Sequence, residues 1–292
     1  MDIIIQQFVS AISIGCVYGL IALGYSFVWN AAGVVNLAQG HFAMLGAFLF
    51  GVTLTNRLGL PLVPATLILV TTMAAFGVLT ERVFYRPFSK ANIRTILVAL
   101  LALGMLLANL AIIIWDPYPK GTPGPWGQRG LVIGGASILY QNIFIIVMTS
   151  ALLIGQHYFF KYTIYGKYFR AVSSDKATAA LIGIDTERSI AMTFAYSAVV
   201  AGIAGLLIAP LMAISPQLAN MGFKGFGACV VGSFSSTLGA MAGGLMIGFF
   251  EQFGSFYISS AYREAIVYII ITLFLLFRPE GLFGGKKEVG SL

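Results

Sequence analysis

The stretch QFVSAISIGCVYGLIALGYSFVW, residues 7–29, holds 23 consecutive residues without one charged side chain. As a helix it would be about 34 Å long, which exceeds the roughly 30 Å hydrocarbon thickness of a bilayer. The residues before it lack the basic patch and the small-residue cleavage site of a secretory signal peptide. We therefore expect residues 7–29 to form a retained first transmembrane helix.

Similar apolar runs recur along the rest of the chain. Of its 292 residues, 59% are hydrophobic and 9% are charged, whereas a soluble domain has about 25% charged residues. No segment is left to form a separate soluble core, so the sequence predicts one all-α, polytopic membrane domain over residues 1–292. About eight spans are expected, at 7–29, 40–56, 62–80, 96–114, 140–160, 190–210, 240–257 and 264–277.

Two further apolar stretches, 31–39 and 222–236, are short and rich in glycine and small polar residues. Non-helical backbone survives at membrane depth only where protein or a water-filled cavity satisfies its polar groups. We interpret both stretches as re-entrant or broken-helix segments. The second is expected to enter from outside, turn near Ser235–Gly239 and return through the span at 240–257.

Lysine and arginine fall unequally on the two sets of connections between the spans. Because basic residues concentrate on the cytoplasmic side of membrane proteins, the richer set is expected inside, with the C-terminus inside and the N-terminus outside. This placement also explains the net charge of +7 without a nucleic-acid partner. The expected cytoplasmic residues are Arg82, Arg86, Lys90, Arg94, Lys161, Lys167, Arg170, Lys176, Arg188, Arg278, Lys286 and Lys287; the expected outer ones are Arg57, Lys120, Arg129, Lys224 and Arg263.

The cytoplasmic segment 161–189 includes GKYFRAVSSDKATAALIGIDTERS, residues 166–189, with seven charged residues. Ser174 is expected to cap a helix of about two turns with Asp175 beside it, and Gly183 to end that helix in a left-handed conformation. The helix would carry one small apolar face. Because so short a helix is marginal in water, it is either part of a solvated connection or a docking site for a cytoplasmic protein. The residues of the apolar face are Ala177, Ala180 and Leu181.

Polar side chains within the predicted membrane region are few. NAAGVVNLAQGHFAMLG, residues 30–46, contains Asn36, Gln39 and His41, and polar groups at this depth need partners or water. They either cap the broken helix and tie spans together, or they face a translocation pathway. Glu251 lies inside a predicted span and is expected to face protein or water. It is either a structural side chain or part of the pathway.

The sequence predicts no catalytic residue and no metal site. Cys16 and Cys229 lie in apolar spans, and His41 and His157 lie on different segments. The chain contains no GxxxxGK[ST] pattern, so we expect it not to hydrolyse ATP itself. His157 is expected at the membrane interface, in a belt with neighbouring tyrosines.

The stretch GKYFRAVSSDKATAALIGIDTERSIAMTFAYSAVVAGIAGLLIAP, residues 166–210, resembles bacterial branched-chain amino-acid ABC transporter permeases of the LivH type. GLIALGYSFVWNAAGVVNLAQGHFAMLGAF, GFGACVVGSFSSTLGAMAGGLMIGFFEQF and LFLLFRPEGLFG resemble the same family, in the same order along the chain. The resemblance implies that segment 161–189 is similar to the coupling helix that seats on an ATPase subunit. The coupling residues would be Arg170, Ala171, Asp175, Ala177, Ala180, Leu181, Gly183 and Ile184.

The resemblance also implies the partners of the chain. They would be a homologous second permease subunit, two cytoplasmic ATPase subunits and an external or periplasmic substrate-binding protein, in a bacterial inner membrane and its lipid. The chain would bind no cofactor, because ATP would be used by the ATPase subunits. The outer loop 115–139 would be a contact for the binding protein or a plain lid or linker.

Branched-chain or other hydrophobic amino acids are the cargo that the resemblance implies, with urea, amides and small carboxylates as alternatives. The competing class of protein is an ion-coupled secondary transporter or channel for a small polar solute. Such a protein would need paired carboxylates within the membrane, or an acid facing a base. It would have no need of a coupling segment.

Overall fold

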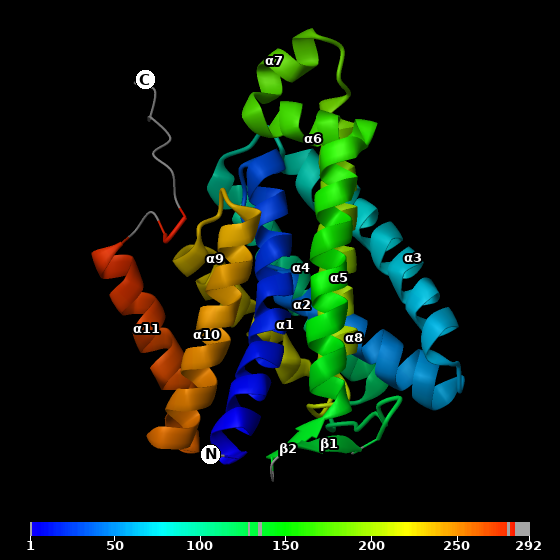
Figure 1. The fold of residues 1–292 in the computed structure, drawn as a ribbon. Helices are drawn as coiled ribbons and strands as arrows, with labels where there is room; N and C mark the ends of the chain where they lie inside the picture. The colour runs from blue at the N-terminus through cyan, green and yellow to red at the C-terminus, as the bar shows by residue number, and fades with distance from the viewer. Residues whose placement is uncertain (1, 128, 134–135, 279–280, 284–292) are drawn as a thin grey trace.

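The computed structural model describes residues 2–127, 129–133, 136–278 and 281–283. Long helices run roughly side by side and form one bundle, with the N-terminus at the end opposite the helices α6 and α7 (Figure 1). The long helices are α1 (Asp2–Ala32), α3 (Leu62–Thr80), α4 (Ile93–Trp115), α5 (Tyr140–Tyr162), α8 (Thr186–Ile208), α10 (Thr237–Tyr257) and α11 (Arg263–Phe277).

Shorter elements join and interrupt the long helices. They are α2 (Gln39–Ala47), which continues into the π-helical η1 (Phe48–Arg57), η2 (Glu81–Tyr85), η3 (Arg86–Phe88), α6 (Ile164–Ser174), α7 (Lys176–Leu181), η4 (Pro216–Asn220), α9 (Met221–Gly232) and η5 (Ser260–Tyr262). Two antiparallel strands, β1 (Gly130–Ile133) and β2 (Ala136–Leu139), lie at the end of the bundle opposite α7 (Figure 1).

Helices α1 and α8 form the centre of the bundle, since most of each is buried. Small residues let neighbouring backbones approach α1 closely, as is common between membrane helices. A Cβ atom on Gly15 would lie 2.8 Å from Cα of Leu245 in α10, so the two helices touch backbone to backbone. Helices α3, α4, α5 and α11 are mostly exposed and apolar, which suits helices in contact with lipid.

The predicted all-α architecture is confirmed, and all eight predicted span ranges fall on helices. Within the described residues, six helical segments are long and apolar enough to cross a membrane, namely Ile3–Ala32, Leu62–Phe88, Ile93–Trp115, Tyr140–Tyr162, Thr186–Ile208 and Ser260–Phe277. The two remaining predicted ranges, 40–56 and 240–257, fall on α2 with η1 and on α10. The total of eight spans stays a prediction.

The chain leaves the helical conformation in both stretches that were predicted to be broken. Residues 33–38 separate α1 from α2 without helical structure, and Gly33 there has a φ of 69°. The stretch 222–236 is the helix α9 followed by a turn, after which α10 begins at Thr237. That turn lies two to three residues earlier than the predicted Ser235–Gly239, because Ser236 caps α10 by accepting from the Gly239 N–H.

The β-hairpin of β1 and β2 was not predicted. It occupies part of the outer loop 115–139, whose backbone also pairs with the connection after α8 through Lys120 and Ile214. The sequence LVIGGASIL, residues 131–139, places two glycines between runs of strand-forming residues, which is a common hairpin signal. The fold is therefore all-α with one small added sheet.

The segments predicted to be cytoplasmic lie at one end of the bundle. Arg86, from the connection between α3 and α4, pairs with Glu187 at the start of α8, with 3.2 Å between Nη1 and Oε2. The stretch 281–283 lies at the same end, where the Leu282 N–H donates to the carbonyl of Val231 over 2.9 Å. Which side of the membrane this end faces remains a prediction.

Candidate functional site: coupling segment and buried polar groups

The segment 161–189 folds into two helices at one tip of the molecule (Figure 1). The first, α6, begins where the Thr163 hydroxyl accepts from the Gly166 N–H. The second, α7, is the predicted two-turn helix, but Ser174 is not its cap. Asp175 is the N-cap, because its carboxylate accepts from the N–H groups of Ala177 and Thr178.

The Asp175 carboxyl holds α7 together at neutral pH. The Thr178 hydroxyl donates to it, and so do the backbone N–H groups of Thr178 and Ala177, which keeps the pKa of Asp175 below its ordinary value. A lowered pKa in the folded state means that the charged form stabilises α7 and that this contribution disappears as the pH falls through that pKa. The cap is therefore intact under physiological conditions.

The end of α7 carries an exposed apolar surface. Leu181 and Ile182 expose 87% and 69% of their surface, and Ala177 and Ala180 are also exposed. Gly183 ends the helix with a φ of 83°, as predicted. The structure thus brings the predicted apolar face together at a protruding tip, where a partner protein could cover it.

Two predicted coupling residues lie on α6 and not on α7. The Arg170 guanidinium donates to the carbonyl of Phe160 at the end of α5, and Ala171 is half-buried. Ile184 follows α7, and its N–H donates to the carbonyl of Ala179 over 3.1 Å. The Arg170 contact attaches α6 to the end of α5, and the Ile184 contact closes the end of α7.

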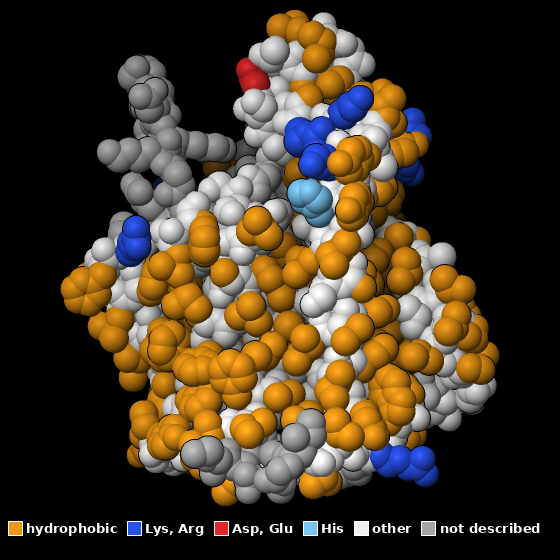
Figure 2. All heavy atoms as spheres, viewed as in Figure 1, with side chains coloured by type: hydrophobic (Ala, Val, Ile, Leu, Met, Phe, Trp, Pro, Cys, Tyr) orange, Lys and Arg blue, Asp and Glu red, His pale blue; other side chains and the backbone are white. Residues whose placement is uncertain are grey.

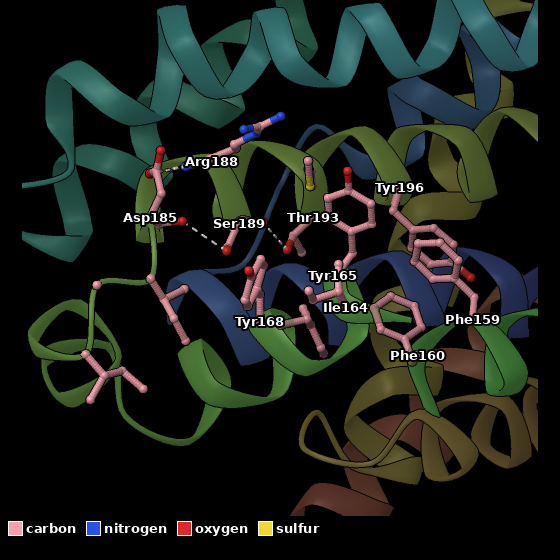
Figure 3. A pocket seen from close by; sticks show the side chains of 15 residues that line it. Phe159, Phe160, Ile164, Tyr165, Tyr168, Asp185, Arg188, Ser189, Thr193 and Tyr196 are labelled. Carbon is pink, nitrogen blue, oxygen red and sulfur yellow. Dashed lines mark hydrogen bonds between the residues drawn. The ribbon is translucent and has the colours of Figure 1, made fainter. Parts of the chain in front are cut away.

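A cavity of about 780 Å³ lies between α6, α8 and the end of α5 (Figure 3). Aromatic rings from α5 and α6 form much of its wall, and the Tyr196 hydroxyl at its inner side donates to Gln156 over 2.6 Å. On α8 the Thr193 hydroxyl donates to the backbone carbonyl of Ser189. The Ser189 hydroxyl in turn donates to the backbone carbonyl of Asp185. Phe160 at the end of α5 also packs against Tyr196, with 5.4 Å between the ring centres, so the end of α5 that leads into the tip contacts α8.

The predicted pathway residues Asn36 and Gln39 form one buried network. The Asn36 amide donates to Oε1 of Gln39 over 3.3 Å, and the Gln39 amide donates to the carbonyl of Ser197 over 3.1 Å. The Ser197 hydroxyl lies 2.8 Å from Oε1 of Gln39 and 3.0 Å from the carbonyl of Gly24, and it can donate its one proton to either. The network ties the break before α2 to α1 and α8. This contact is the structural one of the two roles left open for these side chains.

His41 lies apart from that network. It is half-buried on α2 and faces α4, where a Cβ atom on Gly104 would lie 2.7 Å from the imidazole ring. Its Nδ1 atom makes no hydrogen bond within the described part of the chain. The structure therefore does not bring His41 together with Glu251 into one site.

Glu251 lies in a charged cluster inside the bundle. Its side chain is 1% exposed, and its Oε1 lies 2.8 Å from Nζ of Lys224 and 2.6 Å from Nε of Arg263. The Lys224 ammonium also lies 5.7 Å from the centre of the Tyr18 ring. Glu251 thus faces protein, as expected, and links α9, α10 and α11.

Lys224 was counted with the outer connections, and it also lies in the stretch 222–236 that was expected to re-enter the membrane. It is buried on α9, because the chain re-enters the bundle there before it turns into α10. The sequence signal that was available is the glycine-rich stretch MGFKGFGACVVG around Lys224, in which it is the only charged residue. Glu251 and Lys224 together form an acid facing a base inside the bundle. This is the feature required of the competing ion-coupled class.

The first turns of α2 and α9 meet each other. A Cβ atom on Gly40 would lie 2.7 Å from Cα of Gly222, and one on Gly222 would lie 2.5 Å from Cα of Gly40. The sequences of the two segments, 36–51 and 217–232, are also alike. Aligned without gaps, they share Leu37/Leu218, Ala38/Ala219, Phe42/Phe223, Gly46/Gly227, Ala47/Ala228 and Gly51/Gly232.

The described residues include no group of three His, Cys, Asp or Glu side chains that could hold a metal ion. The two cysteines are buried and unpaired.

Residues 7–276 match a protein family described as branched-chain amino acid transport system / permease component. The chain is 33% identical to the high-affinity branched-chain amino acid transport system permease protein BraD of Pseudomonas aeruginosa, over 98% of this chain and 97% of that protein. It is 30% identical to the high-affinity branched-chain amino acid transport system permease protein LivH of Escherichia coli, over 98% of this chain and 96% of that protein. A probable branched-chain amino acid transport permease of Methanocaldococcus jannaschii is 28% identical over 91% and 88%.

The match covers nearly all the helices described above, from α1 to the end of α11, and the relatives have almost the same length. The chain therefore belongs to the branched-chain amino acid transport permease family.

Proposed function

We propose that the chain is the membrane-spanning permease subunit of an ABC importer for branched-chain or other hydrophobic amino acids. Relatives named as branched-chain amino acid transport permeases match 98% of the chain. The observation that carries the proposal is the protruding α7, whose exposed apolar end is held on α6 and α8. A helix of this kind suits an ATPase-docking element, because it presents apolar surface and is firmly attached to the helices behind it.

In the proposed assembly, the end of the bundle that carries α6, α7 and Arg278 faces the cytoplasm of a bacterial cell. Two ATPase subunits bind there, with Leu181, Gly183 and Ile184 among the contacts. A homologous second permease completes the pathway, and an external binding protein docks at the opposite end, near the loop 115–139. ATP binding would move α7 as a rigid body together with α5 and α8.

Among the proposed pathway residues, His41 has the only side chain that is partly exposed, whereas Asn36, Gln39 and Glu251 are at most 1% exposed. We propose that His41 faces the pathway and that the other three hold its walls. Binding energy for the cargo would then lie mostly in the external binding protein.

The pair of Lys224 and Glu251 is the one observation that favours the ion-coupled class. Membership in a family of ABC importer permeases argues against it. The buried pair also has a sufficient structural role, because it fixes the short α9 to α10.

The test is co-purification of the tagged chain with its partners from the host in mild detergent. Wild type should bring down two ATPase chains and a second permease. Ala180→Arg with Leu181→Arg should lose the ATPases while keeping the second permease, because both residues lie at the exposed tip.

Gly121→Arg is the matched control. It adds the same kind of charge at the opposite end of the molecule, where a side chain at residue 121 meets open space, and it should retain the ATPases. Equal recovery of ATPases with the tip variant would refute the docking role. Solute transport in vesicles by the isolated chain without ATP would refute the importer and favour ion coupling.

A further inference from the structure

A second cavity, of about 350 Å³, lies on the other side of Phe160 and Phe169 from the first. Its walls come from the end of α5, from α6, from α1 through Phe27 and from the first turn of α10. None of the contacts described so far uses the space inside it.

Three basic side chains line this cavity and no acidic one does. They are His157 and Lys161 on α5 and Arg170 on α6. Within the described residues, none of the three makes an ion pair with a carboxylate. Lys161 lies 5.4 Å from the centre of the Tyr162 ring, and Arg170 is held by the Phe160 carbonyl. The cavity is therefore cationic and uncompensated.

The first turn of α10 adds to the positive potential of the cavity. Thr237 and Leu238 lie in the wall, and they begin a helix of 21 residues. The N-terminal end of a helix carries a partial positive charge and favours an anion nearby. Three basic side chains and a helix N-terminus thus surround the same space.

The cavity opens beside a wide apolar surface. Below it on α5, Val147 and Ile154 are exposed, and Tyr158 and Tyr162 stack on each other at the end of the helix, 5.8 Å apart. Figure 2 shows the same arrangement, with lysine and arginine side chains gathered beside a histidine above a broad apolar band. Tyrosines and basic residues in this order mark the headgroup level of a bilayer.

Such a site suits a ligand with a phosphodiester anion and long apolar chains. A phosphate forms charge-assisted hydrogen bonds with guanidinium and ammonium groups, and basic pockets between membrane helices bind anionic lipid headgroups. The acyl chains of a lipid in this place would lie along α5. A free phosphate has the same anionic chemistry but makes no use of the apolar wall.

We propose that this cavity is a binding site for the headgroup of an anionic phospholipid, held by Lys161, Arg170 and His157. The bound lipid would sit between α5, α6 and α10, and so would support the position of α6 and of the tip beyond it. This proposal does not depend on the cargo. Arg170 would act on lipid from its place on α6 even if it makes no contact with an ATPase.

The experiment uses the whole purified transporter in nanodiscs of phosphatidylcholine with a minor fraction of phosphatidylglycerol. Native mass spectrometry then counts the lipids that stay bound to each permease chain. Wild type should retain one phosphatidylglycerol in preference to phosphatidylcholine. Lys161→Gln should bind it about tenfold more weakly, because a charge-assisted hydrogen bond is lost.

Lys167→Gln is the control, since Lys167 is exposed on α6 but does not line the cavity. It should retain the lipid as wild type does. Arg170→Lys keeps the charge and guards against a folding defect, and it should lose less binding than Lys161→Gln. Recovery of ATPase subunits is measured on the same samples, so a failed docking role and a failed lipid site give different results.

Equal lipid retention by Lys161→Gln and wild type would overturn the proposal, and so would equal retention of phosphatidylcholine and phosphatidylglycerol. A further arm adds millimolar inorganic phosphate to lipid-depleted protein in detergent. If phosphate alone raises the melting temperature as much as phosphatidylglycerol does, and Lys161→Gln abolishes that rise, then the site takes a free phosphate and the lipid assignment is wrong.

Discussion

At the scale of single residues, Glu251 places a carboxylate inside the bundle, where a charge needs partners. It is buried, and its Oε1 atom faces two cations, on Lys224 and Arg263. Removing one partner from a buried ion pair typically costs about 3–5 kcal/mol, because the other charge stays behind without compensation. Glu251→Gln should therefore lower the melting temperature of the purified protein strongly, as measured by intrinsic fluorescence in detergent.

The matching variant tests whether the loss comes from uncompensated charge. Lys224→Met leaves Glu251 paired with Arg263, so it should be milder than Glu251→Gln. The double variant Lys224→Met with Glu251→Gln should be more stable than the sum of the two single losses, since the charges disappear together. Additive losses in this cycle would contradict a direct interaction between Lys224 and Glu251.

The sequence singled out Glu251 and Gln39 as buried polar residues but did not predict which residues they contact. Glu251 stood out because an acid within an apolar run needs a partner. Lys224 was counted among the outer charges although it lies in the stretch expected to re-enter the membrane, so its burial beside Glu251 was not foreseen. Gln39 stood out too, but its partner Ser197 lies 158 positions away, and no local pattern joins residues so distant.

At the scale of elements, the contact between α2 and α9 leaves no room for a side chain. Gly40→Ala should destabilise the protein, because the added methyl group would meet the backbone of α9 around Gly222, and such crowding costs about 1–3 kcal/mol. Gly155→Ala, on α5, adds the same atoms in open space. It should be neutral or stabilising by up to about 1 kcal/mol, since alanine is the better helix former.

Thermal unfolding of both variants in the same detergent measures this difference. The informative result is its sign, because both changes add one methyl group to a helical glycine. If Gly40→Ala melts at or above the temperature of Gly155→Ala, then α2 and α9 do not touch as described.

The end of α7 depends on the left-handed backbone of Gly183. A β-branched residue there costs about 1–3 kcal/mol of strain, whereas asparagine tolerates this conformation well. Gly183→Val should therefore weaken ATPase recovery in co-purification by roughly 5-fold or more, and Gly183→Asn should retain it. Equal recovery with valine and asparagine would show that the shape of this cap does not matter for docking.

Elements were predictable where their signal was long or local. Long uncharged runs predicted the helices, and the stretch 31–39 and Gly183 marked places where the helical path ends. The helix α6 was missed although Ile164, Tyr168 and Val172 recur at a helical spacing of four residues. Its tyrosines had been interpreted as part of an interfacial belt, whereas the finished helix packs on α5 and α8. The β-hairpin was missed although the sequence places strand-forming residues on both sides of two glycines.

At the scale of the whole molecule, the charge count grouped the connections by end before any contact was known. The ion pair of Arg86 with Glu187 and the backbone pairing of Lys120 with Ile214 place these connections at two ends of the bundle as grouped. The charge count cannot predict which helices pack against each other at the centre of the bundle. That depends on glycines whose roles appear only when two backbones touch.

The orientation of the bundle can be tested by chemical labelling, because both natural cysteines are buried and should not react with a membrane-impermeant maleimide. Leu58→Cys and Ile182→Cys place exposed thiols at opposite ends. In intact spheroplasts Leu58→Cys should react and Ile182→Cys should not. In inside-out vesicles the reactivity should be reversed.

A bound ATPase could shield residue 182, so Lys90→Cys serves as a second cytoplasmic site away from α7. Lys90 is exposed in the connection between α3 and α4, and it should label from the same side as Ile182→Cys. Coexpression of the ATPases should then protect Ile182→Cys and leave Lys90→Cys reactive. Labelling of Ile182→Cys in intact spheroplasts would put α7 outside the cell, where no ATPase can reach it, and the docking role would be lost together with the orientation.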